Sequence, residues 1–299
     1  MKFVITGASS FIGKALIKEL ANIGHDCIAV IRPGSIAKLG AINSSVKVLE
    51  LDMFDYCNLG HLVKNVDCLV NLSWLGTRGL DRMDTDMQRR SYEYTISAIK
   101  SLIDCGCKII ITSGSQAEYG PLKGYIKETD TPIPNTEYGK YKLKLYEEAL
   151  ELCSINEIKL IEPRFFSLYG PNDAENTMIM SIMRKMLRNE PCNLTQAIQK
   201  WDFLYIKDAI NGLIDLVQKN VESGIYNFAS GDIRMLKDYI EEMKSVLRSN
   251  SALNYGVLPY PKTGMVSIMA NIEKLRSIGW YAKIPFKVGI LNIKANLTQ

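Results

Sequence analysis

Histidine is scarce in this chain, whose 299 residues include only His25 and His61. Because most general-base triads and many zinc sites draw on imidazole, this scarcity argues against both kinds of site, and we expect no metal. Any acid–base chemistry must therefore rest on other side chains.

Paired cysteines and long hydrophobic runs are also missing. The seven cysteines are scattered and odd in number, without CxxC spacing, which is typical of reduced thiols in a cytoplasmic protein. The amino terminus enters an apolar strand pattern at once, without the features of a typical signal peptide. No apolar run reaches the roughly 18 residues that a membrane span needs, so we expect no membrane partner.

The chain has no strong excess of charge of either sign. It carries 36 Lys and Arg against 32 Asp and Glu, which gives a net charge of +4 at pH 7. So small a bias argues against nucleic acid as the partner but allows a small anionic ligand. The hydrophobic share of 47% is that of an ordinary globular protein.

Short apolar runs alternate with longer amphipathic patterns through the first two thirds of the chain. The runs are KFVIT, CIAVI, VKVLELD, DCLVNLS, KIIITS and IKLIEPRFF. This alternation predicts βαβ units, and strands that are apolar throughout predict a parallel sheet covered by helices on both faces. We therefore expect an α/β fold with a doubly wound parallel sheet of the Rossmann type.

A turn of small residues joins the first predicted strand to the first predicted helix, with the sequence Thr6-Gly7-Ala8-Ser9-Ser10-Phe11-Ile12-Gly13. Small residues let the backbone approach a pyrophosphate, which the dipole and free N–H groups of the helix amino terminus then hold. A tight turn with a serine N-cap is the alternative. The place of this turn in the first βα unit favours dinucleotide binding.

The end of the second predicted strand indicates which dinucleotide is bound. A carboxylate at this point binds the ribose 2′-hydroxyl of NAD, whereas an arginine accommodates the 2′-phosphate of NADP. The sequence here has Arg32 and no acid. Unless Arg32 is only a solvated loop residue, this favours NADP(H), with NAD(H) as the alternative.

Two residues that can replace histidine stand on one predicted helix. Tyr138 and Lys142 are four apart and therefore share one helical face. A tyrosine titrates near pH 10 in model compounds, so it needs a nearby cation such as this lysine to act as acid or base near neutrality. Ser113 and Ser115 follow the fifth predicted strand and are the candidate partner serines.

These motifs resemble the extended short-chain dehydrogenases and reductases, a family of NAD-dependent nucleotide-sugar epimerases, dehydratases and 4-ketoreductases. The family fingerprint is TGxxGxxG, and Ser10 stands here in place of its middle glycine. The resemblance runs over nearly the whole chain and implies Ser115, Tyr138 and Lys142 as the catalytic residues. Tyr138 and Ser115 would contact the reacting oxygen of the sugar, while Lys142 would bind the nicotinamide ribose. Members of this family often form homodimers, which we also expect here.

The resemblance, together with the motifs above, also indicates which residues hold the ligands. The implied cofactor-binding residues are Gly7, Ser9, Ser10, Phe11, Ile12, Gly13, Arg32, Asp52, Met53, Leu72, Ser73, Trp74, Ser113, Tyr138, Lys142, Arg164, Phe165 and Phe166. The implied substrate-binding residues are Trp74, Ser115, Gln116, Tyr138, Ser167 and Trp201. Ser167 and Trp201 replace a common asparagine and the usual phosphate-binding arginine of the family.

We predict two regions of different function. Residues 1–165 form the NAD(P)-binding domain, whose core continues to about residue 190 and again around residues 200–230. Residues 166–299 form mainly a smaller α/β substrate-binding lobe. No linker of low complexity separates the two regions.

Within the family, Gln116 and Ala117 stand where dehydratases carry an acidic pair, so a 4,6-dehydratase is not expected. An epimerase retains its NAD, whereas a reductase consumes NADPH, which Arg32 favours. We predict an NADP(H)-dependent reductase of a nucleotide-diphosphate-linked 4-keto-6-deoxy-hexose from surface-polysaccharide biosynthesis. The alternatives are an NAD-dependent nucleotide-sugar 4-epimerase, an NADPH-dependent reductase of a small aldehyde or ketone, and a non-catalytic dinucleotide-binding regulator.

Overall fold

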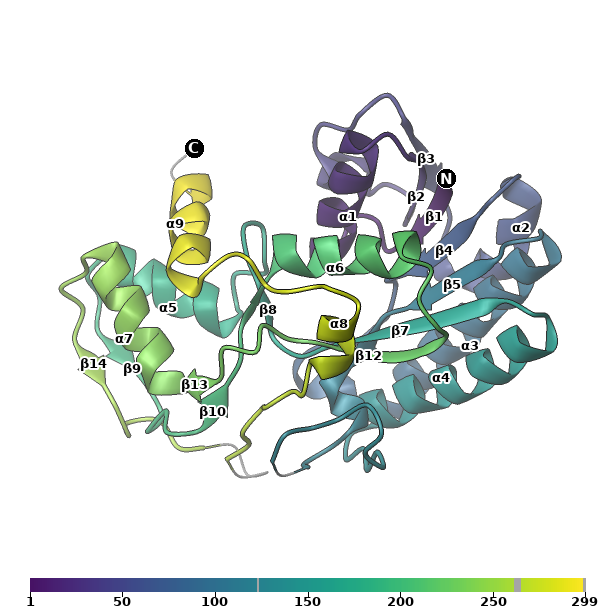
Figure 1. Ribbon diagram of the computed structural model, residues 1–299. Helices are drawn as coiled ribbons and strands as arrows, with labels where there is room; N and C mark the ends of the chain where they lie inside the picture. The colour runs from purple at the N-terminus through teal and green to yellow at the C-terminus, as the bar shows by residue number, and fades with distance from the viewer. Residues whose placement is uncertain (123, 261–264, 298–299) are drawn as a thin grey trace. The chain divides into compact units, whose positions relative to one another are not determined.

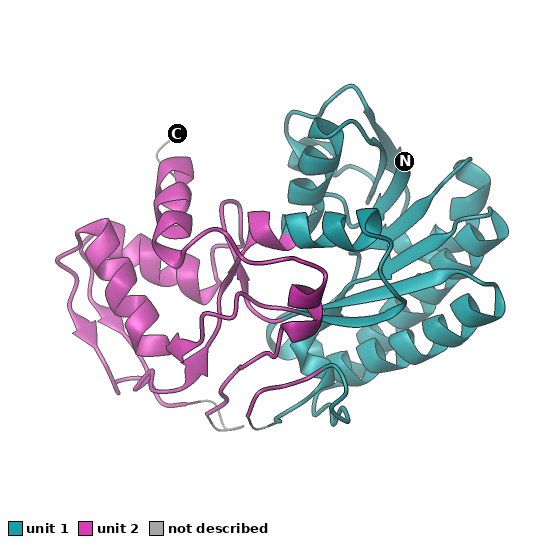
Figure 2. Ribbon diagram, viewed as in Figure 1, with its two compact units in different colours: residues 1–122, 128–165, 210–227 teal, residues 123–127, 166–209, 228–299 magenta. Residues whose placement is uncertain are grey.

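The computed structural model of the chain describes residues 1–122, 124–260 and 265–297 (Figure 1). The chain forms two compact units (Figure 2). The first contains residues 1–122, 128–165 and 210–227, and the second contains residues 123–127, 166–209 and 228–299. The domain predicted over residues 1–165, with a core continuing to about residue 190 and around residues 200–230, overlaps the first unit in part. That unit takes in residues 210–227, whereas residues 166–209 belong to the second unit.

The first unit is built around a parallel sheet. The strands are β1 (Lys2–Thr6), β2 (Asp26–Ile31), β3 (Val46–Glu50), β4 (Cys68–Asn71), β5 (Ile109–Thr112), β6 (Gly114–Ser115), β7 (Lys159–Phe165) and β12 (Gly224–Phe228). Their order is β12-β7-β5-β4-β1-β2-β3, and β6 also pairs with β7. The β1–β2, β2–β3, β1–β4, β4–β5, β5–β7 and β6–β7 pairs are parallel, which confirms the predicted doubly wound sheet.

Helices cover both faces of this sheet, with α3 and α4 below it and α1 above it in the view of Figure 1. The α-helices are α1 (Phe11–Asn22), α2 (Leu59–Leu62), α3 (Thr85–Asp104), α4 (Glu137–Ile155) and α6 (Ile206–Gln218), of which α6 begins in the second unit. Short 3₁₀ helices are η1 (Ile36–Leu39), η2 (Met53–Asn58), η3 (Gly79–Met83) and η4 (Gln116–Glu118). All four residues of β4 are buried, as expected for a strand covered on both faces.

The order of the strands indicates where a ligand binds to the first unit. From β1 the chain runs outward to β2 and β3 on one side, and then returns to β4 on the other side. In open α/β sheets, ligands bind outside the carboxyl ends of the strands at such a reversal. The turns that follow β1 and β4 are therefore where a ligand is expected.

The second unit consists of short elements. They are β8 (Leu168–Tyr169), α5 (Met178–Leu187), β9 (Cys192–Asn193), β10 (Lys200–Trp201), β11 (Leu204–Tyr205), β13 (Arg234–Met235), α7 (Leu236–Leu247), β14 (Leu253–Asn254), α8 (Glu273–Ser277) and α9 (Phe286–Leu297). The strands form three two-stranded pairs. The aromatic rings of Tyr169, Phe203, Tyr239 and Phe286 pack together, with centroid distances of 4.7–6.0 Å, and form an aromatic core.

Across the described residues, no helix combines the length and the apolarity that a membrane crossing requires.

Candidate active site

The turn after β1 is as tight as the sequence predicted. Gly7 has a φ of +63°, and a Cβ atom at this position would lie 2.7 Å from the backbone nitrogen of Ser73, which follows β4. A Cβ atom on Gly13 would lie 2.5 Å from the carbonyl oxygen of Gly7. The Oγ of Ser10 caps α1 by accepting a hydrogen bond from the nitrogen of Gly13 at 3.1 Å. Ser10 thus replaces the family glycine with a helix cap, and the backbone at the crevice stays accessible to a phosphate.

Buried hydroxyl and amide groups join the ends of β1 and β4 beneath this turn. Thr6 Oγ1 donates a hydrogen bond to Asn71 Oδ1 at 2.7 Å, and Ser73 Oγ lies 3.0 Å from Thr6 Oγ1. The phenol of Tyr56 hydrogen-bonds to Ser73 and Thr6, and burial raises the pKa of this phenol to about 12. These bonds fix the backbone of Ser73 at the mouth of the crevice.

Helix α4 brings the predicted tyrosine to the predicted serine. The hydroxyl of Thr136 caps this helix by accepting a hydrogen bond from the nitrogen of Gly139 at 3.1 Å. A Cβ atom on Gly139 would lie 2.3 Å from the carbonyl oxygen of Ala117, so only glycine lets α4 approach the turn that follows β6 this closely. As a result the phenol of Tyr138 hydrogen-bonds to the side chain of Ser115.

The two candidate serines have different partners. Ser115 Oγ accepts a hydrogen bond from Ala117 N at 3.2 Å and also bonds to the phenol of Tyr138. Ser113 instead contacts Lys142, whose Nζ donates to the carbonyl oxygen of Ser113 at 2.7 Å and lies 3.5 Å from its Oγ. This geometry places Ser115 beside Tyr138 and Ser113 beside Lys142.

Lys142 is almost fully buried, with 2% of its surface exposed. Its Nζ lies 3.9 Å from the ring centroid of Trp74, which gives the ammonium a cation–π contact in addition to the bond to Ser113. Burial lowers the pKa of Lys142 to about 8, although the negative charges of Glu118 and Glu162 act in the opposite direction. The ammonium therefore loses its charge within the range in which enzymes operate.

Tyr138 is also buried, and burial raises the pKa of its phenol to about 12. The hydrogen bond with Ser115 and the positive charge of Arg82 lower this pKa, whereas Glu118 and Glu162 raise it. The guanidinium carbon of Arg82 lies 4.7 Å from the centroid of the Tyr138 ring. The phenol therefore holds its proton at neutral pH, as a proton donor must.

A buried charged triad, Glu118, Arg164 and Glu162, lies beside these groups. Arg164 Nε donates to Glu162 Oε1 at 2.9 Å, and Arg164 Nη2 forms an ion pair with Glu118 Oε2 at 2.8 Å. Glu118 Oε1 accepts a hydrogen bond from Ser115 N at 2.6 Å. Burial, with the charge of Glu118, raises the pKa of Glu162 well above its usual range. The triad therefore holds the backbone of Ser115 in place.

The sequence analysis did not identify this triad. A signal was present, because Glu162 and Arg164 interrupt an apolar strand two residues apart and so share one face of it. The side chains of Arg164 and Glu162 are each 1% exposed. The guanidinium of Arg164 forms ion pairs with Glu118 and Glu162. The predicted contact of Arg164 with the cofactor is therefore a prediction for its backbone atoms only.

The loop after β2 contacts an acid of the neighbouring strand that was not predicted from the sequence. Arg32 is exposed, and Gly34 N donates a hydrogen bond to Glu50 Oε1 of β3 at 2.9 Å. Strand β2 carries no acid here, yet its neighbour β3 brings one to the same loop. Of the two implied cofactor-binding residues that follow β3, Asp52 is half-buried and Met53 is 5% exposed and packed in the hydrophobic core.

The other implied cofactor residues of the first unit lie along the same strand ends and turns. Ser9, Phe11, Ile12, Leu72, Ser113 and the substrate residue Gln116 are half-buried, and Phe165 is 8% exposed at the end of β7. Each follows or ends a strand of the sheet or begins α1. Their contacts with the cofactor or the substrate stay predictions.

Three implied ligand residues, Phe166, Ser167 and Trp201, belong to the second unit. Phe166 N donates to Phe228 O at 3.1 Å, and Ser167 O accepts from Leu204 N at 2.8 Å. Trp201 is half-buried in β10, and its Nε1 is buried without a hydrogen-bond partner among residues that the structure describes. The roles predicted for these side chains stay predictions.

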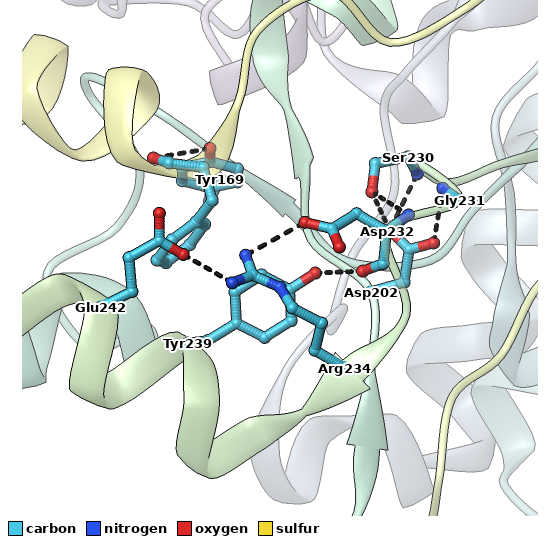
Figure 3. A network of polar contacts seen from close by, with 9 residues as sticks. Tyr169, Asp202, Ser230, Gly231, Asp232, Arg234, Tyr239 and Glu242 are labelled. Carbon is cyan, nitrogen blue, oxygen red and sulfur yellow. Dashed lines mark hydrogen bonds and ion pairs between the residues drawn. The ribbon is translucent and has the colours of Figure 1, made fainter.

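Beside Trp201, a buried acid organises the second unit (Figure 3). Asp202 is fully buried; its Oδ1 accepts hydrogen bonds from the nitrogen and Oγ of Ser230, and its Oδ2 accepts one from Gly231 N. Arg234, opposite Trp201 in the β10–β13 pair, forms ion pairs with Asp232 and Glu242 (Figure 3). The charge of Arg234 is therefore balanced within this unit.

Comparison with known proteins agrees with this architecture. CDP-abequose synthase of Salmonella muenchen is 25% identical over 97% of this chain and 95% of its own length. The dTDP-6-deoxy-L-talose 4-dehydrogenase (NAD(+)) of Aggregatibacter actinomycetemcomitans is 28% identical over 87% of this chain and 95% of its own. The structure of MoeE5 in complex with UDP-glucuronic acid and NAD has the same fold, with a TM-score of 0.86 and 23% identity over 100% of this chain and 99% of that chain.

The NAD dependent epimerase/dehydratase family matches residues 3–229, which include the turn after β1, the group of Ser115, Tyr138 and Lys142, and all of the parallel sheet except Lys2. This chain therefore belongs to the NAD dependent epimerase/dehydratase family.

Proposed function

We propose that this protein is an NADP(H)-dependent reductase that converts the C4 ketone of a nucleotide-diphosphate-linked 4-keto-6-deoxy-hexose to an alcohol. The observation that carries the proposal is the group formed by the half-buried Ser115 and the buried Tyr138 and Lys142 at the carboxyl end of the sheet. The names of the two sequence relatives, an abequose synthase and a deoxy-talose 4-dehydrogenase, support a nucleotide-linked deoxy-sugar as the substrate class.

The residues of the first unit fit a nicotinamide dinucleotide. The turn between Gly7 and Gly13 lets the backbone approach a pyrophosphate at the amino terminus of α1. Ser113 and Lys142 offer polar groups to the nicotinamide ribose, and Arg32 is exposed to meet a 2′-phosphate. When bound, NADPH supplies the hydride that the C4 carbon receives.

The protein supplies the proton. Tyr138, whose phenol is protonated at neutral pH, donates this proton to the C4 oxygen while Ser115 hydrogen-bonds to the same oxygen. The proton on the oxygen and the hydride on the carbon complete the alcohol. Lys142 stabilises the phenolate that remains, as long as its ammonium is charged.

An NAD-dependent nucleotide-sugar 4-epimerase is the second candidate, and one contact favours it. Glu50 places a carboxylate on Gly34, beside Arg32, and a carboxylate in this loop repels a 2′-phosphate. One sequence relative is also named as an NAD(+)-dependent dehydrogenase. The choice between NADP and NAD thus depends on the balance between Arg32 and Glu50.

A substrate panel tests the proposal. The purified full-length chain is incubated with NADPH or NADH and with dTDP-, CDP- and GDP-linked 4-keto-6-deoxy-hexoses, while absorbance at the nicotinamide band reports cofactor consumption and NMR identifies the product. We expect stoichiometric NADPH loss and a C4 alcohol. Interconversion of C4 epimers without net cofactor loss would establish the epimerase, and binding of a dinucleotide without any turnover would establish the regulator.

The same panel includes simple aldehydes and free ketones, because reduction of these without activity on nucleotide sugars would replace the substrate class. We further propose that the protein acts in the cytoplasm as a homodimer in surface-polysaccharide biosynthesis. Light scattering of the purified chain tests the dimer independently of activity.

A further inference from the structure

The loop that carries Arg82 places a second cation on the tyrosine of the active site. We infer that Arg82 is a positioning residue that stabilises the phenolate of Tyr138 and so supports proton donation by this phenol. The guanidinium carbon lies 4.7 Å from the centroid of the tyrosine ring. The inference deepens the proposed function, because it concerns the proton that this function requires.

The loop is held in place by one buried side chain. Gln88 of α3 is fully buried, and its Nε2 donates hydrogen bonds at 2.9 Å to the carbonyl oxygens of both Gly76 and Asp81. Its Oε1 accepts a hydrogen bond from Trp74 Nε1 at 2.6 Å. Residues on both sides of the turn are thereby tied to the helix, and Asp81 directly precedes Arg82.

Arg82 itself has the features of a side chain packed on a ring. It is half-buried, and its Nε is buried without a hydrogen-bond partner in the described part of the chain. A guanidinium above an aromatic face is stabilised by the ring and makes the negative charge of a phenolate less costly. The positive charge of Arg82 does act to lower the pKa of Tyr138.

The other cation near Tyr138, Lys142, does not keep its positive charge at alkaline pH. Lys142 follows on the same helix, with its Nζ 5.9 Å from the centroid of the Tyr138 ring. Burial lowers the pKa of Lys142 to about 8, so its charge is lost in the mildly alkaline range. The guanidinium of Arg82 stays charged throughout the range in which proteins are folded. Arg82 therefore supplies the positive charge that Lys142 cannot maintain.

The remaining charged groups beside Tyr138 are Glu118 of η4 and Glu162 and Arg164 of β7. Both carboxyls raise the pKa of Tyr138. Arg164 forms ion pairs with both carboxyls, so one guanidinium faces two acidic groups. Because this triad offers no excess positive charge, the phenolate of Tyr138 depends on Arg82 and Lys142 for its stabilisation.

A titration of position 138 tests the inference without turnover. The full-length chain, with 3,5-difluorotyrosine placed at position 138 by stop-codon suppression, gives one ¹⁹F signal whose shift reports ionisation of a phenol more acidic than that of tyrosine. We expect Arg82→Met to raise the midpoint by about one pH unit, a tenfold smaller phenolate fraction at a given pH. Arg82→Lys, which keeps the charge, should restore part of the shift.

Arg90→Met is the matched control, because Arg90 is an exposed arginine whose Nε donates to the carbonyl oxygen of Asp86 on its own helix. It should leave the midpoint unchanged, and circular dichroism verifies that each variant is folded. An Arg82→Met midpoint equal to that of the Arg90 control would overturn the inference. That result with normal turnover leaves the proposed function intact, whereas a shifted midpoint in a chain that reduces no sugar sustains the inference and refutes the function.

In the active enzyme the same substitution gives a second readout. Arg82→Met should lower kcat severalfold, because a tyrosine with a higher pKa donates its proton less readily. An effect confined to KM for the sugar nucleotide, with an unchanged kcat, would instead assign Arg82 to substrate binding and contradict the inference.

Discussion

The two units each bury a polar network, and the networks differ in how completely their groups are paired. In the first unit, Tyr138 and Lys142 are buried without a charged hydrogen-bond partner. Tyr138 bonds to Ser115 and has the guanidinium carbon of Arg82 4.7 Å from its ring centroid, and Lys142 contacts the carbonyl of Ser113 and the ring of Trp74. Burial moves both pKa values, to about 12 for the tyrosine and to about 8 for the lysine. Burial thus alters how readily these groups exchange protons.

In the second unit, each charged group of the network is paired with opposite charges or with several hydrogen-bond donors. Asp202 accepts three hydrogen bonds from Ser230 and Gly231, and Arg234 is paired with Asp232 and Glu242 (Figure 3). Such pairing holds turns and strands together. The two networks differ in pairing and not in pKa alone, because burial raises the pKa of the fully hydrogen-bonded Asp202 as well.

Substitution of Tyr138 tests the first network most directly. We expect Tyr138→Phe to lower kcat by about 10²–10⁴-fold, because it removes the proton donor, and to leave the dissociation constant of the dinucleotide almost unchanged. Steady-state kinetics and a fluorescence titration with NADPH measure the two effects. Tyr141→Phe, further along the same helix, is the control and should retain activity. A Tyr138→Phe enzyme with near-normal turnover would refute the assignment of Tyr138 as the donor.

The second network should show its effect in stability. Asp202→Ala leaves the nitrogens of Ser230 and Gly231 without their acceptor, and we expect the free energy of unfolding to fall by about 3 kcal/mol. Urea denaturation measures the change. Asp238→Ala, at an exposed position of α7, should lower stability far less. Equal losses for the two variants would show that the Asp202 network contributes little to the second unit.

The charge of Lys142 should lower the free energy of unfolding, whereas the Asp202 network should raise it. Its folded-state pKa of about 8 lies below the unfolded value of 10.5, so the unfolded chain binds the additional proton between these values. Its charge therefore costs stability, about 3 kcal/mol in full below pH 8, and this cost disappears as the pH rises toward 10.5.

We expect Lys142→Met to raise the free energy of unfolding at pH 7 by about 2 kcal/mol, less than the full cost because the bond to Ser113 is lost, while activity falls. The gain should shrink as the pH rises through 8 toward 10.5, which denaturation at several pH values measures. Lys140→Met is the control, since Lys140 is exposed and forms an ion pair with Glu137. A destabilised Lys142→Met variant at pH 7 would contradict the cost assigned to this charge.

The smallest expected effect concerns cofactor choice at the edge of the first unit. Glu50→Gln removes the carboxylate next to Gly34, and we expect it to improve the ratio of NADPH to NADH affinity by about fivefold, whereas Arg32→Ala should lower this ratio about tenfold. Isothermal titration with each cofactor gives the ratio. Comparable dissociation constants for NADH and NADPH in the unchanged protein would refute the NADP(H) preference, and they would favour the epimerase.

Much of the first unit followed from local sequence. The alternation of apolar strands with helices predicted the parallel sheet, because strands buried on both faces carry apolar residues throughout. The short side chains between Thr6 and Gly13 predicted the tight turn, and the spacing of Tyr138 and Lys142 placed both on one face of α4. Each of these features depends on residues within about ten positions of one another.

Tertiary structure decided what surrounds these groups. The approach of Arg82 to Tyr138, the bond from Gly34 to Glu50 and the pairing of Arg164 with Glu118 join residues 16 to 56 positions apart. No periodicity connects such pairs, because they meet only where the crossing of strands and loops brings them together. The sequence by itself thus determined the shared helical face of Tyr138 and Lys142 and the tight turn after β1, while the folded chain determined the burial and the charges that set the pKa values of these two side chains.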